Sequence, residues 1–248
     1  MGQRRTLNQK RLTKKEVQHL IDTEGKLHEG YTNFFEERYV TGFVNRDKVY
    51  ELPGDRFLYV FDENGSMIPG KGDIYPKDYF LRFVKWNQRV RDDYKNNRAS
   101  SVDHWRYYSR YGAKILDHID ELITELCAIL NLDKSKLDRS YQSLDLVSKA
   151  CEAYGLDNTI KNLYDNLVIC TGEVIKERVN GHWDINKINY SGEYPYIGVD
   201  LPEVQYMAVN VVWSALSGLD EINLRKEARD EVKRRGPEIQ FQKWKHGK

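Results

Sequence analysis

The sequence lacks an excess of charge of either sign. Its 39 Lys and Arg side chains face 38 Asp and Glu side chains, which leaves a net charge of +1. A nucleic-acid-binding protein usually carries a clear basic excess, because its cations displace the counterions held by the phosphates. We therefore expect nucleic acid to be an unfavoured partner, and the absent acidic bias argues equally against a nucleic-acid mimic.

Cysteine is scarce, and apolar runs long enough to cross a bilayer are missing. Cys127, Cys151 and Cys170 are the three cysteines; they lie far apart and form no C-x-x-C pair. We expect them to be reduced, buried thiols and expect no zinc site. The N-terminus has no hydrophobic segment typical of a secretory signal. These absences favour a soluble cytoplasmic protein without a metal or other cofactor.

A short match to a lipidation signal stands at the N-terminus. The first six residues, M-G-Q-R-R-T, fit the N-myristoylation pattern through Gly2, and basic residues follow as far as Lys15. Lipid and basic residues together would make a membrane anchor. We interpret the segment as a solvated arm instead and expect no membrane partner.

What the sequence does contain is a change of hydrophobic period along its first 75 residues. Thr13 opens a helix with a T-K-K-E capping box, and a second helical stretch follows around Tyr31. A β-meander is expected next, with strands over residues 49–52, 56–61 and 66–68. The Gly- and Pro-rich loop over residues 69–76 is interpreted as a plain connector.

The remaining residues, 76–248, predict a helical body with short strands. Apolar residues at helical spacing indicate helices beginning near Pro76 and over residues 101–130, 144–153, 157–180, 202–216 and 220–235. Residues 182–185 and 195–199 are expected as strands, and the tail from Glu238 as peripheral. The predicted fold class is α+β, predominantly α-helical with a small antiparallel β-meander near the N-terminus. Regions 1–75 and 76–248 are expected to pack into one compact domain.

The segment from Asp157 to Val179 predicts a helix with one continuous apolar stripe and a back face that is mainly polar. Ile169 is apolar yet lies on the back face, and Gly172 costs about 1 kcal/mol relative to Ala inside a helix, which another backbone crossing close by explains. We therefore expect the C-terminal half to be covered on both sides. A buried Glu173 then needs a partner or a raised pKa. The residue types leave open a structural anchor, which we favour, and a general acid or base.

Part of the chain resembles a family of small bacterial cytosolic proteins that is poorly characterised. The resemblance rests on residues 137–144, on Gly172-Glu173-Val174-Ile175, and on Gly181-His182-Trp183, followed by a proline-containing strand at 194–197. It covers about residues 137–217. Members are often accessory or toxin-immunity-like proteins, so the resemblance implies a role in binding another protein. It supplies no catalytic residues, and it adds Trp183 to Gly172 and Glu173 as residues of structural or functional interest.

Two further groups of residues have a chemical and a structural interpretation. His118, Glu121 and Glu125 share a helix face and could hold a metal, although solvated charge on an amphipathic helix explains them equally well. Residues 103–111 interleave aromatic and basic side chains, the composition of a stacking platform for single-stranded nucleic acid. A core-facing helix with extended arginines would show the same pattern. The interaction surface expected here comprises His104, Trp105, Arg106, Tyr107 and Tyr108.

Together these observations predict a non-catalytic protein that binds another protein. The abundance of Tyr and Trp suits an interface, and the resemblance points to an immunity- or antitoxin-like inhibitor of a cognate bacterial toxin. Two alternatives stay open: an enzyme of unrecognised type with Glu173 as acid or base, and a nucleic-acid-binding protein that uses the region of Trp105.

Overall fold

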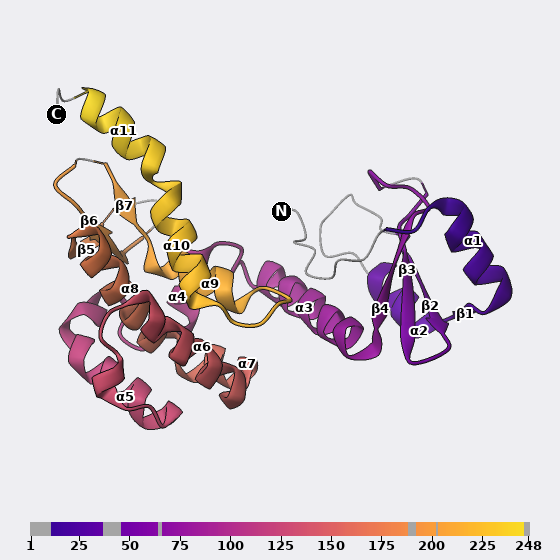
Figure 1. Ribbon diagram of the computed structural model, residues 1–248, viewed down its shortest axis with the longest axis horizontal. Coiled ribbons are helices and arrows are strands. Elements are labelled where there is room, and N and C mark those ends of the chain that lie inside the picture. Colours follow the sequence, from indigo (N-terminus) through magenta and orange to yellow (C-terminus); the bar gives the residue numbers. More distant parts are fainter. Residues whose placement is uncertain (1–10, 37–45, 64–65, 188–191, 202, 246–248) are drawn as a thin grey trace. The chain divides into compact units, whose positions relative to one another are not determined.

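The computed structural model describes residues 11–36, 46–63, 66–187, 192–201 and 203–245 (Figure 1). These residues form two compact units, one within Met1–Asn96 and one within Asn97–Lys248. The boundary between the two units therefore lies just after helix α3 (Lys77–Lys95), whereas the hydrophobic period of the sequence changes near residue 75. The lipidation-like match at residues 1–6 lies outside the described residues.

The first unit combines helices with a small sheet. Its elements are α1 (Lys14–Thr23), β1 (Lys26–Leu27), α2 (Glu29–Glu36), β2 (Lys48–Leu52), β3 (Arg56–Val60), β4 (Gly72–Pro76) and α3 (Lys77–Lys95). The expected capping box opens α1: Thr13 accepts a hydrogen bond from the backbone of Glu16, whose side chain accepts one from the backbone of Thr13. Within the described residues the strands pair antiparallel in the order β1-β2-β3-β4. The predicted meander is thus present.

The last strand of this meander lies elsewhere than predicted. Residues 66–68 form no strand, and β4 comes from the loop that was interpreted as a plain connector. Gly72 pairs with Val60 there, and a Cβ at Gly72 would stand 3.0 Å from Leu58 Cδ1. Asp73 in the same strand accepts two hydrogen bonds from the Arg11 guanidinium, at 3.1 and 2.9 Å. Close packing and this ion pair explain a strand that local composition disfavours.

The second unit is mainly helical and carries a second small sheet. Its elements are α4 (Ser101–Tyr108), the 3₁₀ helix η1 (Gly112–His118), α5 (Ile119–Leu130), the 3₁₀ helix η2 (Lys134–Lys136), α6 (Tyr141–Tyr154), α7 (Leu156–Asn162), α8 (Tyr164–Val179), β5 (His182–Asn186), β6 (Tyr194–Gly198), β7 (Gln205–Tyr206), α9 (Ala208–Leu216), α10 (Leu224–Arg234) and α11 (Gly236–Lys245). Strands β5, β6 and β7 pair antiparallel in that order. The predicted α+β class, mainly helical with an N-terminal meander, is confirmed.

The predicted helix over 101–130 is wrong as one continuous helix. It divides into α4, η1 and α5, and Ser109 between them has extended backbone angles. The reason is a tertiary contact. The carboxylate of Asp165 on α8 accepts hydrogen bonds from the backbone nitrogen of Arg110 at 2.8 Å and from Ser109 Oγ at 3.1 Å. Both donors belong to the turn that follows α4. Asp165, 55 residues beyond Arg110 in the sequence, therefore stabilises the break between α4 and η1.

Two other predicted boundaries also differ. The helix expected over 157–180 is interrupted at Leu163, where ψ is 12° at a φ of −123°, so that α7 and α8 are separate. The tail beyond Glu238 is not merely peripheral, since α11 begins at Gly236 and continues to Lys245. Pro237 is compatible with this start, because a first-turn residue has no helical acceptor for its missing N–H.

Candidate functional site

The centre of the second unit is α8, which contains the two residues singled out by the sequence. Every residue of α8 from Tyr164 to Ile175 is buried. The helix packs against α4, α5, α9 and α10, which Figure 1 shows gathered around it. The prediction that its C-terminal half is covered on both sides holds as far as Ile175, whereas Glu177 and Arg178 in the last turn are exposed. The cover extends to the N-terminal half of the helix as well.

Gly172 and Glu173 both meet Trp183, the third residue singled out. A Cβ at Gly172 would stand 2.0 Å from the indole carbon Cη2 of Trp183. The same indole donates a hydrogen bond from Nε1 to Glu173 Oε1 at 2.8 Å. The group that approaches Gly172 is thus an aromatic side chain of β5 and not the backbone that was expected, and the three residues form one packed group.

The Glu173 carboxylate is 2% exposed and fully engaged by donors. Lys176 Nζ lies 2.5 Å from Oε1, and Arg139 Nε lies 3.2 Å from Oε2. Two cations and the indole N–H therefore compensate its burial, as a buried charge requires. A general base needs a free oxygen aimed at a substrate proton. This geometry suits an anchor that ties α8 to β5 and to the loop before α6.

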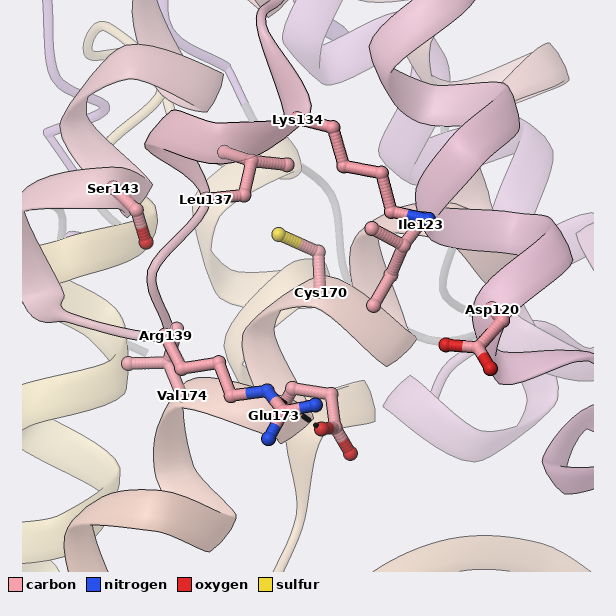
Figure 2. Close-up of a pocket in the computed structure, with 9 residues that line it drawn as sticks. All are labelled: Asp120, Ile123, Lys134, Leu137, Arg139, Ser143, Cys170, Glu173 and Val174. Atoms are coloured by element: carbon pink, nitrogen blue, oxygen red, sulfur yellow. Dashed lines mark ion pairs between the residues drawn. The ribbon is translucent and has the colours of Figure 1, made fainter.

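A pocket of about 120 Å³ opens beside this carboxylate. Figure 2 shows charged and apolar side chains around it, from α5, η2, the loop after η2, α6 and α8. It is lined by Asp120, Ile123, Lys134, Leu137, Arg139, Ser143, Cys170, Glu173 and Val174. Arg139, Lys134 and Asp120 give it both signs of charge, and none of these three was singled out by the sequence.

Cys170 faces this pocket as an unreactive thiol. Burial, with smaller contributions from Cys127, Cys151 and Glu173, raises the pKa of Cys170 to about 12. The thiolate is the nucleophilic form of cysteine, and at neutral pH it is almost unpopulated here. The pocket therefore holds no activated cysteine.

The interaction surface predicted on α4 is only partly at the surface. Trp105 is 0% exposed and donates from Nε1 to Asp165 Oδ1 at 3.0 Å, and His104 is buried with it. Tyr108 stacks on the ring of buried Tyr164. Arg106 is exposed and Tyr107 is 62% exposed. Trp105 is therefore wrong as a member of the predicted surface, because its indole is a core side chain. Nucleic-acid binding by the rest of this region stays a prediction.

Asp165 is a structural residue of α8 that was not singled out from the sequence. Its side chain is 2% exposed. It accepts hydrogen bonds from the Trp105 indole, from Ser109 Oγ and from the backbone nitrogen of Arg110. A carboxylate in the first turn of a helix with a long apolar stripe was the available signal, although the donors could not be named without the fold.

The His118, Glu121 and Glu125 face is occupied by ordinary polar contacts. His118 Nδ1 lies 2.7 Å from Glu121, and Tyr111 donates to the same carboxylate at 2.9 Å. Glu125 pairs instead with the Arg110 guanidinium. Across the part of the chain that the structure describes, no three His, Cys, Asp or Glu side chains are grouped as metal ligands.

An exposed aromatic pair lies on α11. Phe241 is 57% exposed and Trp244 is 78% exposed, and their ring centroids are 5.9 Å apart. The opposite face holds the helix to the unit: Gln242 is buried and donates to Glu203 at 2.8 Å, and Ile239 packs on the core. The pair is thus presented on a helix whose other face is anchored.

Comparisons with known proteins give no family for this chain: no family model, no curated protein and no solved structure matches it. The resemblance of residues 137–217 to immunity-like bacterial proteins stays a prediction. Among the helices of the described residues, none is both apolar enough and long enough to span a bilayer.

Proposed function

We propose that this protein is a non-catalytic binding protein whose partner is another protein. The observation that carries the proposal is the exposed pair Phe241 and Trp244 on the anchored helix α11. Large aromatic side chains lose little conformational entropy on binding and dominate the energetics of interfaces. Exposing neighbouring aromatic rings to water is unfavourable in free energy. Contiguous exposed apolar patches therefore mark interaction sites.

The charges near this pair define the chemistry of the partner. Lys233 and Lys245 are exposed on α10 and α11. Glu231 is paired with Arg234, Glu238 is paired with Arg235, and Glu203 accepts a hydrogen bond from Gln242. A partner with an acidic surface around an apolar pocket would complement this face. The resemblance of residues 137–217 to immunity-like proteins supports the finer form of the proposal. In that form the protein is an immunity- or antitoxin-like inhibitor of a bacterial toxin.

The contacts of Glu173 support a binding protein rather than an enzyme. Both oxygens of this carboxylate have donors, and the nearby Cys170 thiol is held protonated by burial. Neither Glu173 nor Cys170 therefore offers the free base or activated nucleophile that an active site would need.

The test compares three versions of the full chain as bait in source-cell extract. These are the wild type, the double variant Phe241→Ser/Trp244→Ser, and the control Leu146→Ser, whose side chain is 39% exposed on α6. A protein held by the wild type and the control should be lost with the double variant. With that protein purified, we expect the affinity to fall about 30-fold or more, since a central hot-spot residue is worth about 2 kcal/mol.

Three results would overturn the proposal. One is the same set of proteins captured by all three baits. A second is a wild-type chain that self-associates through these rings, as shown by light scattering. A third is that the wild-type chain binds anionic vesicles or an oligonucleotide instead of a protein. For the inhibitor form, co-expression with the captured protein should restore growth that the partner alone suppresses, and the double variant should not restore it.

A further inference from the structure

The pocket beside Glu173 carries charge of both signs on separate elements. Asp120 belongs to α5, Lys134 to η2, and Arg139 to the loop before α6. In Figure 2 Arg139 lies with Glu173, and Asp120 and Lys134 lie on the side formed by α5 and η2. The formal charges of the lining side chains therefore balance, with two cations and two carboxylates.

The two carboxylates differ in how far their charge is compensated. Glu173 is buried between the indole of Trp183 and two cations. Asp120 is exposed, and within the described residues no hydrogen bond or ion pair reaches its carboxylate. Asp120 can therefore accept a cationic group from a ligand without breaking a contact.

The cations also keep donors for a ligand. Lys134 Nζ donates to the neutral hydroxyl of Thr124 at 2.8 Å, so that no carboxylate neutralises it among the described residues. Arg139 uses Nε toward Glu173, and its side chain is 51% exposed. Among the described residues neither of its two terminal nitrogens donates a hydrogen bond. A guanidinium that keeps its Nη1–Nη2 edge for a ligand suits a carboxylate.

Arg139 is also held in a backbone conformation that side chains disfavour. Its φ is +62°, in the left-handed region that residues other than glycine rarely adopt. The turn around it is stabilised by Asp138, which accepts a hydrogen bond from the backbone of Ser140 at 3.0 Å. Such strain recurs at ligand-binding positions, where it directs a side chain. Here it accompanies a guanidinium directed at the pocket.

We propose that this pocket binds a small zwitterion, an α-amino acid with an aliphatic side chain. Its carboxylate pairs with Arg139, and its ammonium pairs with Asp120. Its side chain packs on the apolar part of the lining, which consists of Ile123, Leu137 and Val174. A simple anion would be repelled by Asp120, and a simple cation by Arg139 and Lys134, so a ligand with both charges is favoured.

The experiment uses the full chain and calorimetric titration with L-valine at low salt. Isobutyrate and isobutylamine serve as probes that keep only one charge each. We expect valine to bind, and each half-probe to bind at least tenfold more weakly. Asp120→Asn should weaken valine tenfold or more. The control Lys136→Gln, an exposed η2 residue outside the lining, should bind valine as the wild type does.

Arg139→Gln provides a second test, with thermal unfolding measured alongside because it also removes a partner of Glu173. Valine binding should disappear while the variant remains folded. Absent binding of valine to the wild type would overturn the proposal. So would isobutyrate binding as tightly as valine and unaffected by Asp120→Asn, which would indicate a simple anion site. The outcome is independent of Phe241 and Trp244, so either proposal can fail alone.

Discussion

The indole of Trp183 lies against the bare Cα of Gly172, at a distance that leaves no room for a methyl group. A Cβ there would stand 2.0 Å from Cη2 and 2.2 Å from Cζ2. The indole cannot simply move aside, because its Nε1 donates to buried Glu173. The glycine inside α8 thus allows β5 to place an aromatic ring and a hydrogen bond on the central helix.

The first prediction concerns Gly172→Ala. Overpacking a core costs about 1–3 kcal/mol, and alanine recovers about 1 kcal/mol of helix propensity. We expect a net loss of up to about 2 kcal/mol in the free energy of unfolding, measured by urea denaturation. Gly236→Ala is the matched control, since nothing lies within 4 Å of a Cβ there. In the background Trp183→Ala the same substitution should become neutral or stabilising. Equal costs in both backgrounds would contradict the contact.

The second prediction concerns Asp165→Ala. The substitution leaves the Trp105 indole N–H, Ser109 Oγ and the Arg110 backbone N–H without their acceptor inside the unit. Each buried donor left unsatisfied costs about 1–3 kcal/mol, so we expect the free energy of unfolding to fall by about 3 kcal/mol. The near-ultraviolet circular dichroism of the tryptophans should change too. Asp157→Asn, at an exposed site on α7, is the control. Stability within 0.5 kcal/mol of wild type, about the spread of surface substitutions, would show that the turn does not depend on Asp165.

The third prediction concerns pH. Hydrogen bonds from Arg110, and to a smaller extent from Asn166, hold the pKa of the Glu125 carboxyl below its ordinary value. A group whose pKa is lowered by folding stabilises the fold above its unfolded pKa, about 4.3 for Glu. That contribution is lost as the pH falls through the lowered folded pKa. The Tm should therefore fall more steeply below about pH 4.3 in the wild type than in Glu125→Gln.

The control for this pH prediction is Glu177→Gln, a substitution of an exposed carboxyl on α8. It should leave the steepness of the Tm profile unchanged. If Glu125→Gln and the wild type gave parallel profiles, the Arg110 contact would carry no measurable pH dependence.

The fourth prediction concerns the thiols. Burial raises the pKa of Cys151 and Cys170 to about 12, and it also raises the pKa of Cys127. The folded chain should therefore react very slowly with a disulfide reagent at about pH 8, where an ordinary thiol is partly ionised. In concentrated guanidinium chloride all three cysteines should react at once. A fast thiol in the folded protein, identified by mass spectrometry, would show that one of these sites opens.

Hydrophobic period and capping determined much of the secondary structure from the sequence alone. The capping box at Thr13, the first two meander strands and the apolar stripe of α8 are local patterns, and each appears in the structure. The same period indicated that α8 is covered on two sides, because Ile169 and Gly172 do not fit a helix with one solvated face. These features need only neighbours within a few residues.

The features that depend on contacts between residues far apart in the sequence were decided only by the tertiary structure. The break after α4 depends on Asp165, the strand β4 on packing around Gly72, and the burial of Trp105 on the position of α8. None of these contacts leaves a periodic trace, because a hydrogen bond across fifty residues has no fixed spacing. The pocket arises in the same way, from α5, η2, the loop after η2, α6 and α8, which meet only in the folded unit. Glu173 could therefore be singled out from the sequence, whereas Arg139, Lys134 and Trp183 could be identified as its neighbours only from the fold.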